Sequence, residues 1–232
     1  MPKTAVITGA SRGIGYHAAL SLCEQGHQVI VIARSADRLD SLKNEYPGLI
    51  HTYPSDLSDP GQVQQLVSGL KEKGMSVDIL INNAGRLIPK PFLELDDQDW
   101  YEMFEVNVMA SVRLIRELYS CLNEGAHIVN ISSMAGFQGA SKFPSLTGYS
   151  VAKAGLSVLA ECLPGELSSK SITSNTLCLG AVQTEMLSEA FPGLEAPVTP
   201  EDMGAYVAEF ALTGSKFFKG KILPVALDDP DA

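Results

Sequence analysis

A tyrosine and a lysine four residues apart are the strongest chemical feature of this 232-residue chain. Tyr149 is the first and Lys153 the last residue of the run Tyr-Ser-Val-Ala-Lys, and a helix would carry both on one face. A phenol titrates near pH ~10, and a cation held beside it lowers that pKa by favouring the phenolate. The pair therefore predicts an acid/base catalyst. The spacing also fits a tyrosine and a lysine that merely share a solvated helix face.

A glycine-rich turn near the N-terminus is the second signal. An apolar, β-branched run over 4–8 leads into Gly9-Ala-Ser-Arg-Gly-Ile-Gly15, and an amphipathic stretch follows over 16–25. This order predicts a strand, a turn and a helix whose positive N-terminus can receive a pyrophosphate. The glycine spacing differs from the commoner Gly-x-Gly-x-x-Gly pattern. Glycines that only turn the chain are the alternative.

Five motifs occur in the order of one known family. They are Thr-Gly-Ala-Ser-Arg-Gly-Ile-Gly at 8–15, Asn-Asn-Ala-Gly at 82–85, Val-Asn-Val around Asn107, Asn-Ile-Ser-Ser-Met-Ala-Gly at 130–136 and Tyr-Ser-Val-Ala-Lys at 149–153. With them the chain resembles the short-chain dehydrogenases/reductases from Pro2 to about Val225. Among these it looks closest to the carbonyl and 3-oxoacyl reductases.

The resemblance implies an NADPH-dependent oxidoreductase that interconverts a carbonyl compound and its alcohol by hydride transfer. In that chemistry Tyr149 protonates the carbonyl oxygen, and Ser133 hydrogen-bonds the same oxygen. Lys153 lowers the phenol pKa and holds the nicotinamide ribose. Asn107 resembles a residue of an interrupted helix whose backbone carbonyl anchors a relay water. A polar residue satisfied within its own helix is the alternative for Asn107, and Ser132 is the competitor of Ser133.

Cofactor contacts are implied by the same resemblance at the glycine turn and at later strand ends. The implied residues are Gly9, Ser11, Arg12, Gly13, Ile14, Gly15, Arg34, Asp56, Leu57, Asn83, Ala84, Gly85, Tyr149, Lys153, Gly180, Val182 and Thr184. Asp56 resembles an adenine-contacting aspartate. Its alternative is an N-cap for the helix expected after Ser58.

The cofactor type is predicted from the end of the second expected strand. NAD-binding folds place an acid there for the ribose hydroxyls, and an arginine accommodates a 2′-phosphate instead. Here the position holds Arg34, with no Asp or Glu between Val29 and Ala36. Arg12 adds a second cation, so NADP(H) is the expected cofactor. Alternatively, Arg34 caps the strand in solvent.

Alternating apolar runs and helical stretches predict a doubly wound parallel α/β (Rossmann) sheet with helices on both faces. Strands are expected over 4–8, 28–33, 49–53, 78–81, 126–131, 172–179 and 221–225. The whole chain, 1–232, is expected to form a single dinucleotide-binding domain. Gly9, Asn83, Ser133 and Gly180 each follow or end a strand, and ligands of such sheets collect there.

Composition narrows the function classes. The net charge of −10 argues against nucleic acid and anionic membranes as partners, so an anionic cofactor needs a local basic pocket. Apolar runs are only strand-length and no leader is visible, which predicts a cytoplasmic protein. No metal site is expected. The cysteines are read as buried thiols and the histidines as residues of helices or strand edges: Cys23, Cys121, Cys162, Cys178, His17, His27, His51 and His127.

Several segments depart from the family pattern. The loop over 138–147 is long and is expected to shape the substrate mouth. Leu179-Gly180 replaces a Pro-Gly turn, and Pro164 is expected to kink the helix that begins near Tyr149. That helix commonly packs against a second subunit in the family. The kink and the short tail over 227–232 therefore leave open whether the chain forms a homodimer or homotetramer.

Residues 185–199 are expected to form a substrate lid. Met186, Leu187, Phe191 and Leu194 would supply its apolar face, or else belong to the core. Arg86 and Lys90 would meet an acidic substrate group or be solvent-exposed cations. The substrate stays open among acyl-linked ketones, aldehydes, quinones and steroids. A non-enzymatic NADP-binding sensor or scaffold and a sugar-nucleotide epimerase or dehydratase are the alternative functions.

Overall fold

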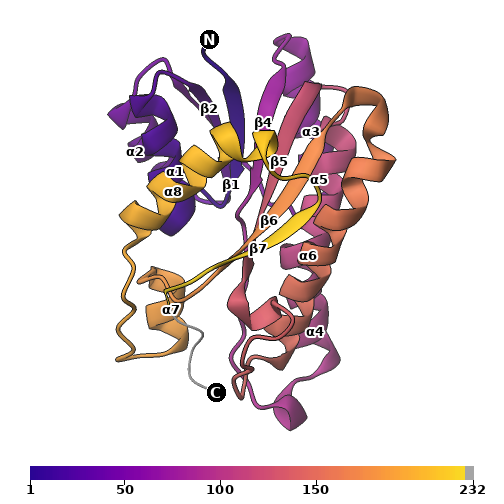
Figure 1. Ribbon diagram of the computed structural model, residues 1–232. Helices are drawn as coiled ribbons and strands as arrows, with labels where there is room; N and C mark the ends of the chain where they lie inside the picture. The colour runs from indigo at the N-terminus through magenta and orange to yellow at the C-terminus, as the bar shows by residue number, and fades with distance from the viewer. Residues whose placement is uncertain (228–232) are drawn as a thin grey trace.

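Seven parallel strands form one sheet in the computed structural model, which describes residues 1–227 (Figure 1). The sheet order is β3-β2-β1-β4-β5-β6-β7. The strands are β1 (Thr4–Thr8), β2 (Gln28–Ala33), β3 (Ile50–Pro54), β4 (Val77–Asn82), β5 (Leu122–Ser133), β6 (Thr173–Leu179) and β7 (Lys221–Val225). The expected doubly wound α/β fold is confirmed.

Helices cover both faces of this sheet (Figure 1). They are α1 (Gly13–Glu24), α2 (Ala36–Glu45), α3 (Pro60–Glu72), α4 (Asp97–Phe104), α5 (Ala110–Leu118), α6 (Thr147–Glu166), α7 (Glu185–Ala190) and α8 (Pro200–Thr213). Side chains of α1, α2 and α8 pack in one core layer, and those of α3 and α5 pack in the other, beside which α6 lies. The central strands are apolar on both faces because both faces are covered.

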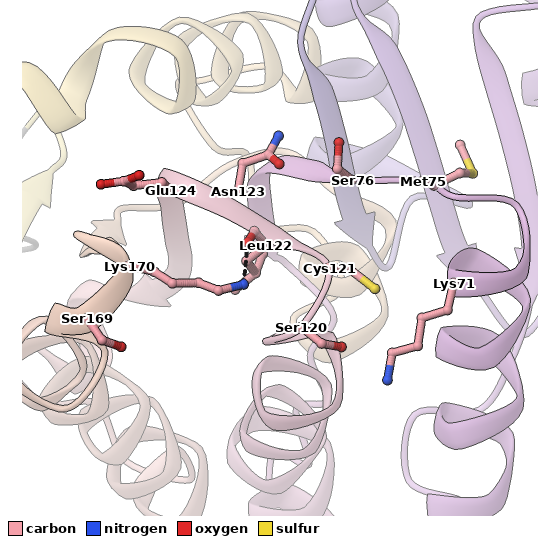
Figure 2. Close-up of a pocket in the computed structure, with 10 residues that line it drawn as sticks. All are labelled: Lys71, Met75, Ser76, Ser120, Cys121, Leu122, Asn123, Glu124, Ser169 and Lys170. Atoms are coloured by element: carbon pink, nitrogen blue, oxygen red, sulfur yellow. Dashed lines mark hydrogen bonds between the residues drawn. The ribbon is translucent and has the colours of Figure 1, made fainter.

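The sheet order reverses between β1 and β4, so the connections from these neighbouring strands leave in opposite directions. Ligand sites of open α/β sheets lie at the carboxyl ends of the strands at such a point. The opposite, amino-terminal edge carries a hollow of about 760 Å³ lined by Lys71, Cys121 and Lys170, among others (Figure 2). That hollow lies away from every residue expected to do chemistry. In the described part of the chain, no helix is long and apolar enough to cross a bilayer.

α6 continues through Pro164 to Glu166, so the proline does not end the helix, and the kink stays a prediction. Two other expectations about individual residues are wrong. Cys162 is exposed, since it lies on the face of α6 that turns away from the sheet. His127 is buried in the middle of the sheet instead of at a strand edge. The expectation about the tail over 227–232 falls largely outside the described residues.

Candidate active site

The glycine turn leaves the N-terminus of α1 open. Gly9 and Gly13 have φ values of 66° and 60°, the left-handed region that favours glycine. A Cβ on Gly15 would lie 2.8 Å from the Gly9 carbonyl oxygen and would also meet Asn83 Nδ2, so this position tolerates no side chain. Arg12 occupies the N-cap of α1 without a side-chain cap hydrogen bond, and the first turn holds no acid. These features fit a pyrophosphate, which would accept from the first-turn amides.

Thr8 joins the glycine turn to the segment after β4. Its Oγ1 accepts hydrogen bonds of 2.9 Å from the backbone amides of Asn83 and Ala84. Asn83 Nδ2 in turn donates to the carbonyls of Thr8 and Gly9, at 3.0 and 3.2 Å. The two strand ends at the reversal point are thereby fixed to each other. Thr8 was not among the predicted site residues, although a polar residue at the end of an apolar strand was a usable signal.

Tyr149 and Lys153 lie on one face of α6, as the spacing predicts. Lys153 Nζ is 5.7 Å from the centroid of the Tyr149 ring and donates a 2.8 Å hydrogen bond to the Ile131 carbonyl. Burial raises the pKa of Tyr149 to about 12, and a hydrogen bond with Ser133 offsets part of that rise. Burial lowers the pKa of Lys153 to about 8. Burial therefore outweighs the Ser133 hydrogen bond at Tyr149, and the lowering of the phenol pKa by Lys153 stays a prediction.

The two adjacent serines at the end of β5 have different surroundings. Ser133 is half-buried, contacts Tyr149 and accepts a 3.1 Å hydrogen bond from the Ala135 amide. Ser132 is 3% exposed and donates a 2.8 Å hydrogen bond to the Lys153 carbonyl. Ser157 donates to Ser132 Oγ at 2.9 Å, which completes a buried hydroxyl pair. β5 thus places Ser133 beside Tyr149, whereas Ser132 hydrogen-bonds to α6.

Asn107 is fully buried in a π-helical segment, Glu105–Met109, between α4 and α5. Its amide donates to the carbonyls of Arg86 and Met103, each at 2.8 Å, and its Oδ1 accepts from the Arg86 amide at 3.2 Å. The π-helical segment is the expected interruption of the helix. The Asn107 side chain makes one of its hydrogen bonds, that to the Met103 carbonyl, within the same helix. A Cβ on Gly85 would meet Asn107 Oδ1 at 3.1 Å and Lys153 Nζ at 3.3 Å. Asn107, Gly85 and Lys153 therefore converge.

Arg34 lies beside Asp56 at the carboxyl ends of β2 and β3. Arg34 is exposed and forms no ion pair with any residue in 1–227. The Ser58 hydroxyl and, to a smaller extent, the Ser58 amide donate hydrogen bonds to Asp56 Oδ1 and hold the pKa of Asp56 below its usual value, and Arg34 adds to this effect. Asp56 is not the N-cap of α3, because Asp59 caps that helix by accepting from the amides of Gly61 and Gln62.

The other implied cofactor residues surround the same edge of the sheet. Gly180 donates a 2.9 Å backbone hydrogen bond to the Val225 carbonyl, which holds the turn that lacks the proline. Thr184 caps α7 by accepting from the Leu187 amide, and its methyl group would be 3.5 Å from a Cβ on Gly13. Leu57 and Val182 are buried, whereas Ser11 and Ile14 are half-buried.

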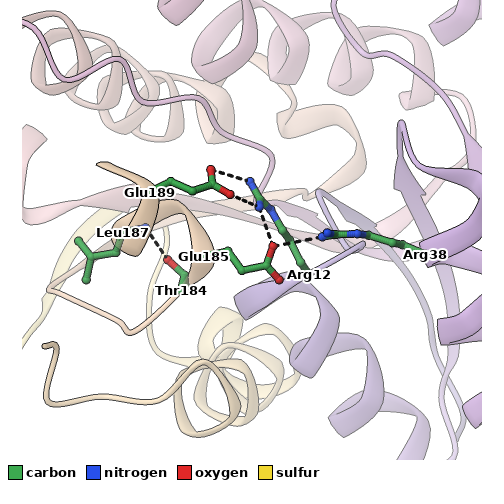
Figure 3. A network of polar contacts seen from close by, with 6 residues as sticks. All are labelled: Arg12, Arg38, Thr184, Glu185, Leu187 and Glu189. Atoms are coloured by element: carbon green, nitrogen blue, oxygen red, sulfur yellow. Dashed lines mark hydrogen bonds and ion pairs between the residues drawn. The ribbon is translucent and has the colours of Figure 1, made fainter. Parts of the chain in front are cut away.

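Arg12 forms ion pairs with two glutamates that were not among the predicted site residues. Glu185 and Glu189, one turn apart on α7, both accept hydrogen bonds from its guanidinium (Figure 3). Their spacing of four residues was a signal for one shared face. Arg86 and Lys90 are also paired, with Glu102 and Asp99 of α4, at 2.6 Å each. The four apolar residues expected to face the substrate are not core residues, because none of Met186, Leu187, Phe191 and Leu194 is buried.

A parallel sheet with an open helix N-terminus at its reversal point defines a Rossmann-type α/β protein. The family model for short chain dehydrogenases matches residues 3–195. Dehydrogenase/reductase SDR family member 11 of Gallus gallus is 36% identical over 197 residues, which are 78% of this chain and 75% of the relative. The chain belongs to the short-chain dehydrogenase/reductase family, and it is an oxidoreductase of that family.

Two further comparisons agree with this membership. An uncharacterized oxidoreductase of Staphylococcus saprophyticus is 32% identical over 216 residues, which cover 90% of this chain and 91% of that protein. The crystal structure of a dehydrogenase/reductase from Sinorhizobium meliloti 1021 superposes with a TM-score of 0.87 at 28% identity. That match covers 99% of this chain and 95% of the solved one.

Proposed function

We propose that the protein is an NADP(H)-dependent oxidoreductase that interconverts a carbonyl compound and its alcohol, with Tyr149 as the proton donor. One observation carries the proposal. Tyr149, Ser133 and Lys153 meet at the carboxyl end of β5, on the same edge of the sheet as the open N-terminus of α1. A carbonyl oxygen placed there can receive hydrogen bonds from two hydroxyl groups.

The chemistry divides between the cofactor and the side chains. NADPH, when bound, supplies the hydride. Tyr149 keeps its proton at neutral pH, because its pKa is raised to about 12, and so it can donate to the oxygen that gains charge. Ser133 hydrogen-bonds the same oxygen. Lys153 uses one N–H on the Ile131 carbonyl and offers its remaining donors to a ribose hydroxyl.

The preference for NADP(H) is inferred from Arg34. A guanidinium binds a phosphate through charge-assisted hydrogen bonds, and Arg34 forms no ion pair within 1–227. Asp56 and Leu57 lie after the neighbouring strand and are assigned to the adenosine side of the cofactor. The half-exposed segment 185–199 is assigned as the lid over the substrate.

The direct test is NADPH oxidation, followed by absorbance, against a panel of ketones linked to an acyl thioester, small aldehydes, quinones and steroids. We expect turnover with at least one class and a matching alcohol product. Tyr149→Phe assayed on the same substrate should lose that turnover while still binding NADPH. If NADPH binds but the wild type reduces no member of the panel, or if Tyr149→Phe remains active, the proposed chemistry is wrong.

A further inference from the structure

Two acids of α7, the N-cap arginine of α1 and one arginine of α2 form a connected charge cluster (Figure 3). Arg12 Nη1 lies 2.6 Å from Glu185 Oε2 and 2.7 Å from Glu189 Oε1. Arg12 Nη2 is 3.4 Å from the second oxygen of Glu189, and Arg38 lies 3.2 Å from Glu185 Oε2. The cluster joins the glycine turn to the start of the proposed lid.

These contacts use the part of Arg12 that a phosphate would need. A guanidinium binds a phosphate with parallel N–H donors, and here carboxylate oxygens already occupy donors on both Nη atoms. Two arginines and two glutamates also give the cluster no net charge. A phosphate dianion arriving beside Glu185 and Glu189 would be repelled by both.

The charge cluster also holds α7 in its position. None of the residues of α7 is fully buried, so packing contributes little to its position. Its N-terminus is held by the Thr184 cap, and its acidic face is held by Arg12 and Arg38. Displacing both glutamates from Arg12 therefore removes the ion pairs that hold α7 to the glycine turn, and leaves the contacts of Thr184 and Arg38.

We propose that Glu185 and Glu189 are specificity-determining residues, which compete with the 2′-phosphate of a dinucleotide for Arg12. Their presence weakens the preference for NADP(H), and binding of a 2′-phosphate loosens α7. This inference rests on the proposed dinucleotide binding. Arg34 is then the first residue to contact the 2′-phosphate. Arg12 contacts it only after Glu185 and Glu189 have moved away from the guanidinium.

The test compares NADPH and NADH binding to the wild type and to Glu185→Gln/Glu189→Gln. The double variant keeps the side-chain size and removes both competing charges. We expect NADPH to bind roughly tenfold tighter, while the Kd for NADH changes less than about threefold. Glu195→Gln is the matched control, since it removes one charge from the same segment at a residue without an ion pair in 1–227. Nicotinamide fluorescence reports both affinities.

Amide hydrogen exchange of 185–191 provides a second readout that needs no turnover. Exchange should be faster in the cofactor-free double variant than in the wild type. In the wild type, NADPH should raise the exchange rate of 185–191 more than NADH does. An unchanged ratio of NADPH to NADH affinity in the double variant overturns the inference, even where NADPH binds the wild type well. If neither dinucleotide binds the wild type, the proposed function fails as well.

Discussion

Lys153 Nζ lies 5.7 Å from the centre of the Tyr149 ring but gives its hydrogen bond to the Ile131 carbonyl, 2.8 Å away. The cation is thus near the phenol without being hydrogen-bonded to it. Burial of the ring then sets the pKa of Tyr149, which rises to about 12. A phenol in this state gives up a proton only to a group that becomes strongly basic, such as a carbonyl oxygen that is receiving a hydride.

Tyr149→Phe removes the proton donor and keeps the ring. We expect kcat/KM to fall by about 10² or more, while the Kd for NADPH stays within a few-fold of wild type. Steady-state kinetics and fluorescence titration measure the two quantities. Tyr101→Phe is the control, because Tyr101 is 68% exposed and lies outside the site. Near-normal turnover of Tyr149→Phe would contradict the assignment.

Substitutions of the two neighbouring serines should have different effects: one should lower activity and the other should lower stability. Ser133→Ala removes the hydroxyl that contacts Tyr149, so kcat/KM should drop by about 10² with less than about 1 kcal/mol lost from the free energy of unfolding. Ser132→Ala removes a buried hydrogen bond to the Lys153 carbonyl and should cost about 1–2 kcal/mol of unfolding free energy. Denaturant unfolding and initial rates measure both variants. The reverse pattern would exchange the two roles.

The sequence predicted the sheet well because its strands are continuous apolar runs that end in glycine or polar residues. The bounds of β1, β2 and β7 match the expected ranges. β5 begins at Leu122, earlier than expected, since Leu122 pairs with Val77 before the register shifts. Polar residues over 123–124 and the following Gly125 interrupt the apolar pattern there, so local sequence did not reveal the pairing.

The candidate site was predictable in its residues but not in its electrostatics. Motif spacing brought Tyr149, Lys153 and Ser133 together, and the structure places them so. The partners of Arg12 come from 173 and 177 positions further along the chain, and no local pattern connects such distant residues. The pKa of Tyr149 likewise depends on burial by other segments. Charge pairing and desolvation are tertiary properties, and only the fold reveals them.

Arg34→Asp should exchange the preferred cofactor. The new carboxylate repels a 2′-phosphate and can accept the ribose hydroxyls, so NADPH should bind roughly ten- to a hundredfold more weakly while NADH improves relatively. Lys216→Asp makes the same change in net charge on a short helical turn after α8 and should leave the ratio unaltered. Fluorescence titration of both cofactors measures the ratio. A ratio of NADPH to NADH affinity that Arg34→Asp leaves unchanged would identify Arg34 as a solvated strand cap.

A buried histidine predicts how stability depends on pH. His127 is 2% exposed, and its Nδ1 lies 3.0 Å from the Ala211 carbonyl. A carbonyl only accepts, so Nδ1 carries the proton, and Nε2 accepts from Asn175 Nδ2 at 3.0 Å. Protonation would place a second N–H against the Asn175 donor in a buried site. Burial accordingly lowers the pKa of His127 to about 4.

The contribution of His127 to stability should therefore be lost in acid. Above pH ~6.5 the ring is neutral in both states, and the stabilisation is complete; below that the unfolded chain takes up the proton first. The free energy of unfolding falls by about 1.4 kcal/mol per pH unit until the pH reaches the folded pKa, which is a loss of roughly 2 kcal/mol at pH ~5.

The variant His127→Gln tests this, because glutamine keeps a donor and an acceptor but does not titrate. Urea unfolding of both proteins between neutral pH and pH ~5 should show the stability of the wild type falling relative to the variant by that amount. Parallel curves would mean that His127 is protonated in the folded protein at the same pH as in the unfolded chain.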